Sequence, residues 1–255
     1  MNRATLSGGP ATLLLAESDG AADLAAFLSR LLRFDRAAAV RLKAVRGPEG
    51  RDVLAVFGRL PLGSSGAIAI RTARLGTGGD GTTGSDADRE GPAGSAPEID
   101  IDVTVSAGQL LDAVDAASGR VAVPAPVTGP AWAGLLPPRA GWRLIGEPPV
   151  IEVFPELMAG VREFRERSEA VPEHHRSRQV LDALADEIWS RPLTVLPELP
   201  LRAVHAAYVI GFLKPGAPLT VHRAGGWLRL SAPAGSVALR GAAAPGAGLG
   251  LSPLR

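Results

Sequence analysis

The chain has 255 residues, of which 46% are hydrophobic, and its 27 Lys and Arg residues nearly balance its 26 Asp and Glu residues. This length and composition provide a core for one large domain or two small ones, and the net charge of +1 excludes a uniformly basic nucleic-acid binder and a polyacidic tail. The chain has no cysteine, which excludes disulfides, thiolate metal ligands and a cysteine nucleophile. Arginine outnumbers lysine, and glycine and proline are frequent, a bias typical of a GC-rich bacterial genome.

The apolar runs of the chain are too short for targeting or for crossing a membrane. The run Ala11–Leu15 is shorter than the apolar region of a secretory signal. The run Val204–Leu213 falls short of the roughly 20 residues that span a bilayer. We therefore expect a cytoplasmic protein with no membrane partner.

The N-terminal part, residues 1–125, alternates between strand and helix patterns. After Ser18, four apolar residues recur at helical spacing and predict one buried stripe: Leu24, Phe27, Leu28 and Leu31. Strands are expected over residues 37–46, 51–60, 66–74 and 99–105. Ser106 and Gln109 form a capping-box pattern that begins a second helix, which Gly119 would end. These patterns predict an antiparallel sheet with helices on one face.

A change of composition interrupts this sheet. Residues 76–97 contain no large apolar side chain to offset the entropy of ordering, and we interpret them as a disordered insertion. Within it, Gly76, Gly78 and Gly81 have the spacing of a dinucleotide-binding fingerprint. No helix pattern follows these glycines to bind a phosphate, so the match is attributed to low complexity.

The C-terminal part begins after a proline-rich connection, residues 126–150. Pro-Glu pairs at Pro155, Pro172 and Pro197 predict three helix starts, because proline fits the first helical position. After Pro215 the apolar period changes to two and predicts a three-stranded meander. We expect a helical domain over residues 151–240 that ends in this meander, and a flexible tail over residues 241–255. The fold class is therefore α+β.

The outer face of the meander is the candidate binding site. Residues 197–255 carry six Lys and Arg against the single acid Glu198. A cationic sheet face with an indole can bind phosphates by charge and a base by stacking. The predicted site residues are His222, Arg223, Trp227, Arg229 and Arg240. The site requires a free-standing sheet whose guanidinium side faces outward; the alternative is an inert, solvated face on which Trp227 covers a core edge.

Carboxylates and histidines elsewhere form no recognisable catalytic or metal site. Glu98, Asp100 and Asp102 share one strand face and could bind a cation, or could face an arginine such as Arg71.

The histidines are equally uninformative. His174 and His175 are adjacent, so they point apart on a helix and cannot readily bind one metal ion; an exposed helix cap is the better interpretation. His205 is expected to pack in the fold or to face a partner. The chain has no nucleophile elbow, Walker loop or zinc-protease motif. The catalytic residues, if the chain is an enzyme, are left unknown, and we predict no metal and no cofactor.

The function expected from these features is that of a non-enzymatic macromolecule-binding or regulatory protein, with another protein as partner and the C-terminal part as binding unit. One alternative is nucleic-acid binding by the basic meander. The order of two helices and a hairpin matches a winged helix only in outline, because the connection Arg191–Pro200 is too long for a helix-turn-helix. The other alternative is an enzyme with an unrecognised site around Trp132, Trp142 and the histidines. The oligomeric state is left open.

Overall fold

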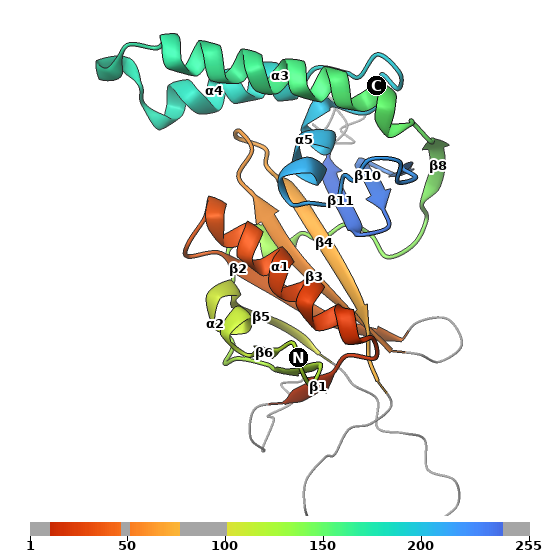
Figure 1. The fold of residues 1–255 in the computed structure, drawn as a ribbon. Coiled ribbons are helices and arrows are strands. Elements are labelled where there is room, and N and C mark those ends of the chain that lie inside the picture. Colours follow the sequence, from red (N-terminus) through yellow and green to blue (C-terminus); the bar gives the residue numbers. More distant parts are fainter. Residues whose placement is uncertain (1–10, 47–51, 77–100, 242–255) are drawn as a thin grey trace, which may run out of the picture. The chain divides into compact units, whose positions relative to one another are not determined.

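The computed structural model describes residues 11–46, 52–76 and 101–241, which contain five α-helices and eleven strands (Figure 1). The mixed α+β class expected from the sequence is confirmed. The insertion expected at residues 76–97, apart from Gly76, and the tail expected from residue 241, apart from Gly241, lie outside the described residues. The chain divides into two compact units, one of residues 1–58 and 71–134 and the other of residues 59–70 and 135–255.

The first unit contains two antiparallel sheets with the strand orders β5-β2-β3-β4 and β1-β7-β6. Strands β3 and β4 each contribute residues to both units. Its elements are β1 (Thr12–Leu14), α1 (Ser18–Phe34), β2 (Ala39–Arg46), β3 (Asp52–Leu60), β4 (Ala67–Arg74), β5 (Asp102–Ser106), α2 (Ala107–Asp112), β6 (Val114–Asp115), β7 (Arg120–Ala122) and the 3-10 turn η2 (Ala131–Gly134).

Helix α1 supplies the core of this unit. Its predicted stripe is confirmed, because Leu24, Phe27, Leu28 and Leu31 are all fully buried. The helix lies so close to β3 that a Cβ atom on Gly58 would be 2.6 Å from Cδ2 of Leu31. A side chain at this position would therefore force the buried side chain of Leu31 to shift.

Helix α2 begins as predicted but ends early. The Ser106 hydroxyl accepts a hydrogen bond from the Gln109 backbone N–H, as the capping pattern indicates. The prediction that Gly119 ends this helix is wrong, because α2 ends at Asp112 and β6 follows at once. Gly119 instead lies in the turn between β6 and β7, where its φ of +70° favours glycine.

The second unit contains a sheet with the strand order β4-β11-β10-β9-β8, covered by helices. Helix α5 packs on β10 and β11, and the hairpin formed by α3 and α4 packs on α5. The remaining elements of this unit are β8 (Arg143–Gly146), α3 (Val150–Ala170), the 3-10 turn η3 (Glu173–His175), α4 (Arg178–Trp189), α5 (Leu201–Val209), β9 (Thr220–Ala224), β10 (Trp227–Ala232) and β11 (Gly235–Arg240).

The predicted three-stranded meander is formed by β9, β10 and β11, which pair antiparallel in sequence order. It is not free-standing, and that expectation is wrong. Strand β11 pairs with β4 at Ile68–Ile70, and β9 pairs with β8. Neither partner strand could be predicted from apolar periodicity, because β4 lies far away in the chain and β8 is only four residues long.

The Pro-Glu pairs do not mark helix starts. Helix α3 begins at Val150, and Pro155 lies within it. Val150 and Val153 extend the buried stripe of Leu157 backwards by two turns, and this burial favours helix on both sides of the proline. The carbonyl of Pro149 accepts hydrogen bonds from two N–H groups of the first turn.

The other two pairs lie in turns. Pro172 precedes η3, and α4 begins later, at Arg178, where the Ser177 hydroxyl caps the N–H of Val180. Pro197 lies in a turn before α5, which begins at Leu201. Within the described ranges, no helix is long and apolar enough to cross a membrane.

Candidate functional site

The strand register separates the predicted meander site into two faces. His222 pairs with Arg229, and Trp227 pairs with Arg240, so these four side chains alternate onto one face of the sheet. Arg223 pairs with Leu228 and therefore points to the opposite face. The structure thus brings four of the five predicted residues together and leaves Arg223 apart from them.

The guanidinium of Arg229 contacts an aromatic ring of the same chain. Its guanidinium carbon lies 4.3 Å from the ring centre of Trp142, a cation–π geometry. Its Nε atom is buried without a hydrogen-bond partner in the described residues, and burial lowers the pKa of the group. The indole expected to lie beside this cation was Trp227, but Trp142 takes that role.

His222 lies beside Arg229 in the sheet. Partial burial and then the charge of Arg229 lower the pKa of His222, while Glu147 acts in the opposite direction. His222 is therefore a neutral imidazole near neutral pH, and it adds no charge to this face.

The other histidines lie elsewhere in the second unit. The imidazole of His205 stacks on Trp189, with ring centres 3.8 Å apart and planes 17° from parallel. Burial lowers the pKa of His205 to about 4, so this side chain is a neutral packing group. His174 and His175 are exposed in η3, with ring centres 4.1 Å apart.

Asp102, which the sequence places on one strand face with Glu98 and Asp100, is paired with two cationic side chains. Asp102 forms ion pairs with Arg41 at 2.6 Å and with Lys43 at 2.9 Å, and the hydrogen bond from Arg41 is the main cause of its lowered pKa. Arg71 forms an ion pair with Asp23. Glu98 and Asp100 lie outside the described residues. In residues 11–46, 52–76 and 101–241, no three His, Asp or Glu side chains gather as metal ligands would.

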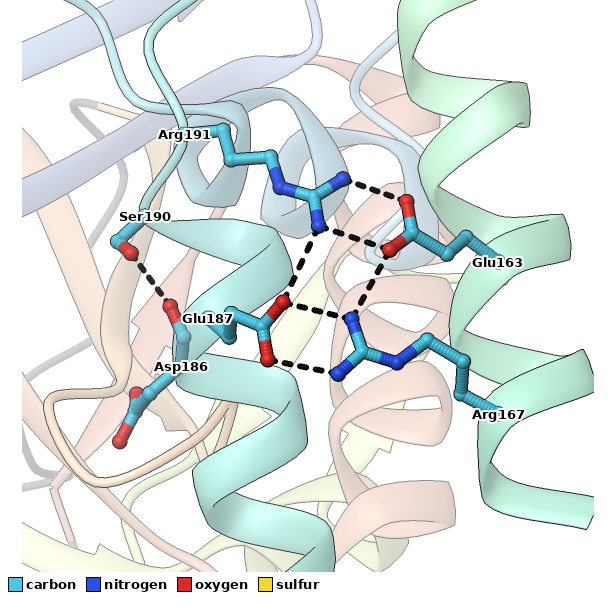
Figure 2. A network of polar contacts seen from close by, with 6 residues as sticks. All are labelled: Glu163, Arg167, Asp186, Glu187, Ser190 and Arg191. Carbon is cyan, nitrogen blue, oxygen red and sulfur yellow. Dashed lines mark hydrogen bonds and ion pairs between the residues drawn. The ribbon is translucent and has the colours of Figure 1, made fainter. Parts of the chain in front are cut away.

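A network of four charged side chains connects the two helices of the α3–α4 hairpin, with two residues on α3, one on α4 and one just beyond α4 (Figure 2). Arg167 donates hydrogen bonds to both carboxylate oxygens of Glu187 at 2.7 Å and to Glu163 at 3.0 Å. Arg191, just beyond α4, donates to Glu163 at 2.7 Å. Hydrogen bonds from Arg191 and Arg167 lower the pKa of Glu163 to about 2. Exposed pairs add little stability singly, but this closed network fixes how the two helices align.

The first half of α3 is apolar on two sides. One side carries the buried stripe Val150, Val153, Leu157 and Gly160. The other side carries Ile151, Phe154 and Met158, which recur at i, i+3 and i+7. Ile151 is 81% exposed and Phe154 is 39% exposed, whereas Met158 is half-buried.

Helix α5 adds an aromatic residue to the second stripe. The ring of Phe154 meets the ring of Tyr208 edge to face, with centres 6.0 Å apart and planes at 72°. Tyr208 is itself 39% exposed. We call the set Ile151, Phe154, Met158 and Tyr208 the α3–α5 surface.

The sequence signal for this surface is the helical spacing of Ile151, Phe154 and Met158. A helix predicted to begin at Pro155 excludes Ile151 and Phe154 from that spacing. A helix pattern begun at Val150 reveals both stripes.

Comparisons with known proteins agree with the division into two parts but give no activity. Residues 9–134 match a family described as "Domain of unknown function (DUF8010)", and residues 137–244 match one described as "Domain of unknown function (DUF8185)". The boundary between the matches coincides with the boundary between the two units after Gly134, except that residues 59–70 of the first match belong to the second unit. No curated protein and no solved structure matches the chain significantly.

Proposed function

We propose that this chain is a non-enzymatic cytoplasmic protein whose second unit binds another polypeptide through the α3–α5 surface. The observation that supports this proposal is the second apolar stripe of α3, with Ile151 81% exposed beside the exposed Phe154–Tyr208 pair. Single exposed apolar residues are common, but contiguous exposed apolar and aromatic side chains are typical of interaction sites.

The residue types and the rigidity of the surface favour binding. Burying an exposed Ile or Phe side chain is worth about 1.5–3 kcal/mol each. Aromatic residues and Met are enriched in interfaces. Because buried Val153 and Leu157 hold α3 from behind, little ordering entropy is lost when a partner binds.

The charges near this surface favour a protein over a nucleic acid. Three acids, Glu147, Glu152 and Glu156, lie between Arg143 and Arg162, which bound the segment that carries the stripe. With three acids against two bases, this segment lacks the excess of cations that binding to phosphates requires.

Nucleic-acid binding by the meander is the second candidate. The common face of Trp227, Arg229 and Arg240 supports it, whereas the contact of Arg229 with Trp142 and the opposite direction of Arg223 weigh against it. This candidate predicts affinity that falls steeply with salt and is lost in Arg229→Glu. The third candidate, an enzyme, has less support, because the histidines of the second unit lie in three separate places.

The experiment that tests the proposal is affinity capture from nuclease-treated cytosol of the source cells, at low and moderate salt. We compare the wild-type chain with Ile151→Asp, which places a charge in the α3–α5 surface at a position where the exposed side chain supports no core. The matched control is Val180→Asp, at a 40% exposed apolar residue of α4 in the same hairpin. We expect a discrete protein to be recovered with wild type and Val180→Asp and lost with Ile151→Asp. Recovery of the same proteins with all three chains would refute the proposal.

A further inference from the structure

We propose that His222 and Arg229 form a binding site for a carboxylate, carried by a ligand whose apolar part lies over Leu144. The inference does not depend on the proposed function, because it concerns the strands of the meander and not the α3–α5 surface. It is motivated by two buried nitrogen atoms that lie on neighbouring strands and lack a hydrogen-bond partner in the described residues.

The two nitrogen atoms belong to side chains that pair directly across the sheet. His222 of β9 lies opposite Arg229 of β10, so their side chains stand next to each other on the same face. The Nδ1 atom of His222 and the Nε atom of Arg229 are both buried, and neither has a partner in the part of the chain that the structure describes. Buried polar groups are rarely left unpaired, so a single ligand that bonds to both nitrogen atoms is favoured.

Trp142 holds the guanidinium of Arg229 by one flat side and leaves its hydrogen-bond donors accessible. The guanidinium carbon lies 4.3 Å from the ring centre of Trp142, and the indole N–H donates to the carbonyl of Pro138 at 2.9 Å, which fixes the ring. The donors of a guanidinium lie in its plane, so stacking on one side does not block them. Arg229 is therefore presented in a fixed orientation to an anion.

Arg229 also lacks a counter-ion. No carboxylate of the described ranges forms an ion pair with it, and burial alone lowers its pKa. A half-buried cation without a counter-ion is unfavourable, and an anion that accepts its hydrogen bonds would remove this cost.

The charges around the two side chains favour a ligand with a single negative charge. The strand register places two arginines on this face, Arg229 and the exposed Arg240, while Glu147 is close enough to His222 to raise its pKa. His222 is neutral near neutral pH. Two cations and one acid leave an excess of one positive charge, which one carboxylate balances, and a planar carboxylate matches the fork of a guanidinium. A nucleic acid brings a row of phosphates instead.

The other residues of the same cross-strand row place the apolar part of the ligand. Ala238, which pairs with Arg229, is 1% exposed, whereas Leu144, which pairs with His222, is 50% exposed. The row thus passes from a covered part of the sheet to an open part. Neighbouring strands lie about 4.8 Å apart, so Leu144 lies about 10 Å from Arg229 across the sheet. A ligand whose carboxylate lies between His222 and Arg229 covers Leu144 with an apolar group of a few carbons.

Two kinds of ligand share this chemistry. One is a small carboxylic acid with a short aliphatic chain, and the other is the C-terminal residue of a polypeptide that ends in an apolar side chain. Both place a carboxylate beside an apolar group, and the experiment below distinguishes them.

The test is NMR of the full chain, with labelled histidine rings, during titration with isocaproate at constant ionic strength. We expect the resonances of His222 to shift saturably and its pKa to rise by about one pH unit, because the bound anion favours the imidazolium. The uncharged amide of the same shape, isocaproamide, should change neither. His174, His175 and His205 lie elsewhere in the second unit and serve as internal references.

Two arginine variants separate this site from a general attraction of anions. Arg229→Gln removes the guanidinium, and we expect it to bind isocaproate at least roughly tenfold more weakly. Arg223→Gln removes an arginine that points to the opposite face and should bind as the wild type does. Equal binding by the wild type and Arg229→Gln, or equal shifts with the acid and the amide, would overturn the proposal. The comparison of acid and amide uses the wild type, so a misfolded variant cannot obscure it.

Further probes identify the kind of ligand. A hexapeptide that ends in a leucine with a free carboxylate is compared with its C-terminal amide and with isocaproate. Binding of the free-acid peptide at least roughly tenfold tighter than that of isocaproate indicates a polypeptide C-terminus, and equal binding indicates a small acid. The carboxylate site stands in both cases. If inorganic phosphate or single-stranded DNA shifts His222 at lower concentrations than either carboxylate, the carboxylate assignment is refuted and the nucleic-acid candidate is favoured. If no carboxylate shifts His222, the site itself is refuted.

Discussion

The carboxylate of Asp186 in α4 accepts a hydrogen bond from the backbone N–H of Ser64, with both oxygens 3.1 Å from the nitrogen, although 122 residues separate the two. The same carboxylate pairs with Arg202 of α5 at 2.6 Å, and Arg202 is only 8% exposed. Asp186 therefore joins two helices to the turn between β3 and β4. The second unit therefore includes a segment, residues 59–70, that is distant in the sequence from the rest of the unit.

Removing this carboxylate should destabilise the protein strongly. In Asp186→Ala, the buried guanidinium of Arg202 loses its only ion-pair partner among the described residues, and the Ser64 N–H loses its acceptor. We expect the free energy of unfolding to fall by about 3 kcal/mol, as for other ion pairs that lose one buried partner. Urea denaturation measures this change.

The control for this variant is Asp182→Ala, one helical turn earlier. Asp182 forms an exposed pair with Arg178, with a separation of 3.5 Å. We expect a loss of less than about 0.5 kcal/mol there. Equal losses in the two variants would contradict the role given to Asp186.

A second prediction concerns the folding of the second unit by itself. A fragment of residues 135–255 lacks residues 59–70, so β11 loses its pairing with Ile68–Ile70 and exposes a sheet edge. We expect this fragment not to unfold cooperatively in calorimetry. Joining residues 59–70 to it through a flexible Gly-Ser linker of about 15 residues should restore a cooperative transition. The prediction fails if the bare fragment already unfolds as the joined one does.

A third prediction concerns pH and His205. Its pKa is lowered to about 4 in the folded chain by burial, whereas the ordinary value is 6.5. Between these values the unfolded chain binds the proton more readily, so stability is highest above the ordinary pKa, falls as the pH falls toward 4 and levels off below. We expect this group to remove about 2 kcal/mol of stability between about pH 7.5 and about pH 5.

The variant His205→Phe tests this assignment. Phenylalanine keeps a ring on Trp189 but cannot be protonated, so the loss of stability on acidification should shrink by that amount. The control Val180→Ala changes an exposed apolar side chain of α4 and leaves His205 in place, so the pH dependence should remain as in wild type. Thermal unfolding followed by circular dichroism at several pH values gives the comparison. Parallel pH curves for wild type and His205→Phe would rule out the assignment.

A fourth prediction concerns the packing of α3 on its neighbours at Gly160. A Cβ atom on Gly160 would lie 2.8 Å from Cδ2 of Leu201 and 3.1 Å from Trp189, so α3 packs on its neighbours through a bare backbone. We expect Gly160→Ala to destabilise the protein by about 1–2 kcal/mol, because overpacking outweighs the gain in helix propensity. In the control Gly108→Ala, the new atom meets only Ser106 at 3.8 Å, so no loss is expected in the same denaturation experiment.

Short-range patterns in the sequence predicted much of the fold. The stripe of α1 and the three strands of the meander depend on apolar periodicity, and both are present. Helix starts were predicted from Pro-Glu pairs and were wrong, because burial of Val150 and Val153 outweighs the missing N–H of Pro155.

The candidate site was harder to predict, because it depends on which segments cover one another. Alternation along the strands correctly grouped Trp227 and Arg229, but it could not show that Trp142 lies over Arg229. The α3–α5 surface depends on Phe154 and Tyr208, which are 54 positions apart and meet only through the packing of α3 on α5. Long-range contacts of this kind leave no periodic signal in the sequence.

The most direct test of the account is photo-cross-linking in living cells with a benzophenone amino acid at position 151. We expect irradiation to join this position to a polypeptide, which mass spectrometry of the adduct identifies, and we expect the adduct to disappear when Phe154→Asp is added. The same amino acid at position 180, another exposed apolar site of the hairpin, should give no such adduct. Absence of an adduct at position 151, or the same adducts at positions 151 and 180, would contradict the claim that the α3–α5 surface binds a polypeptide.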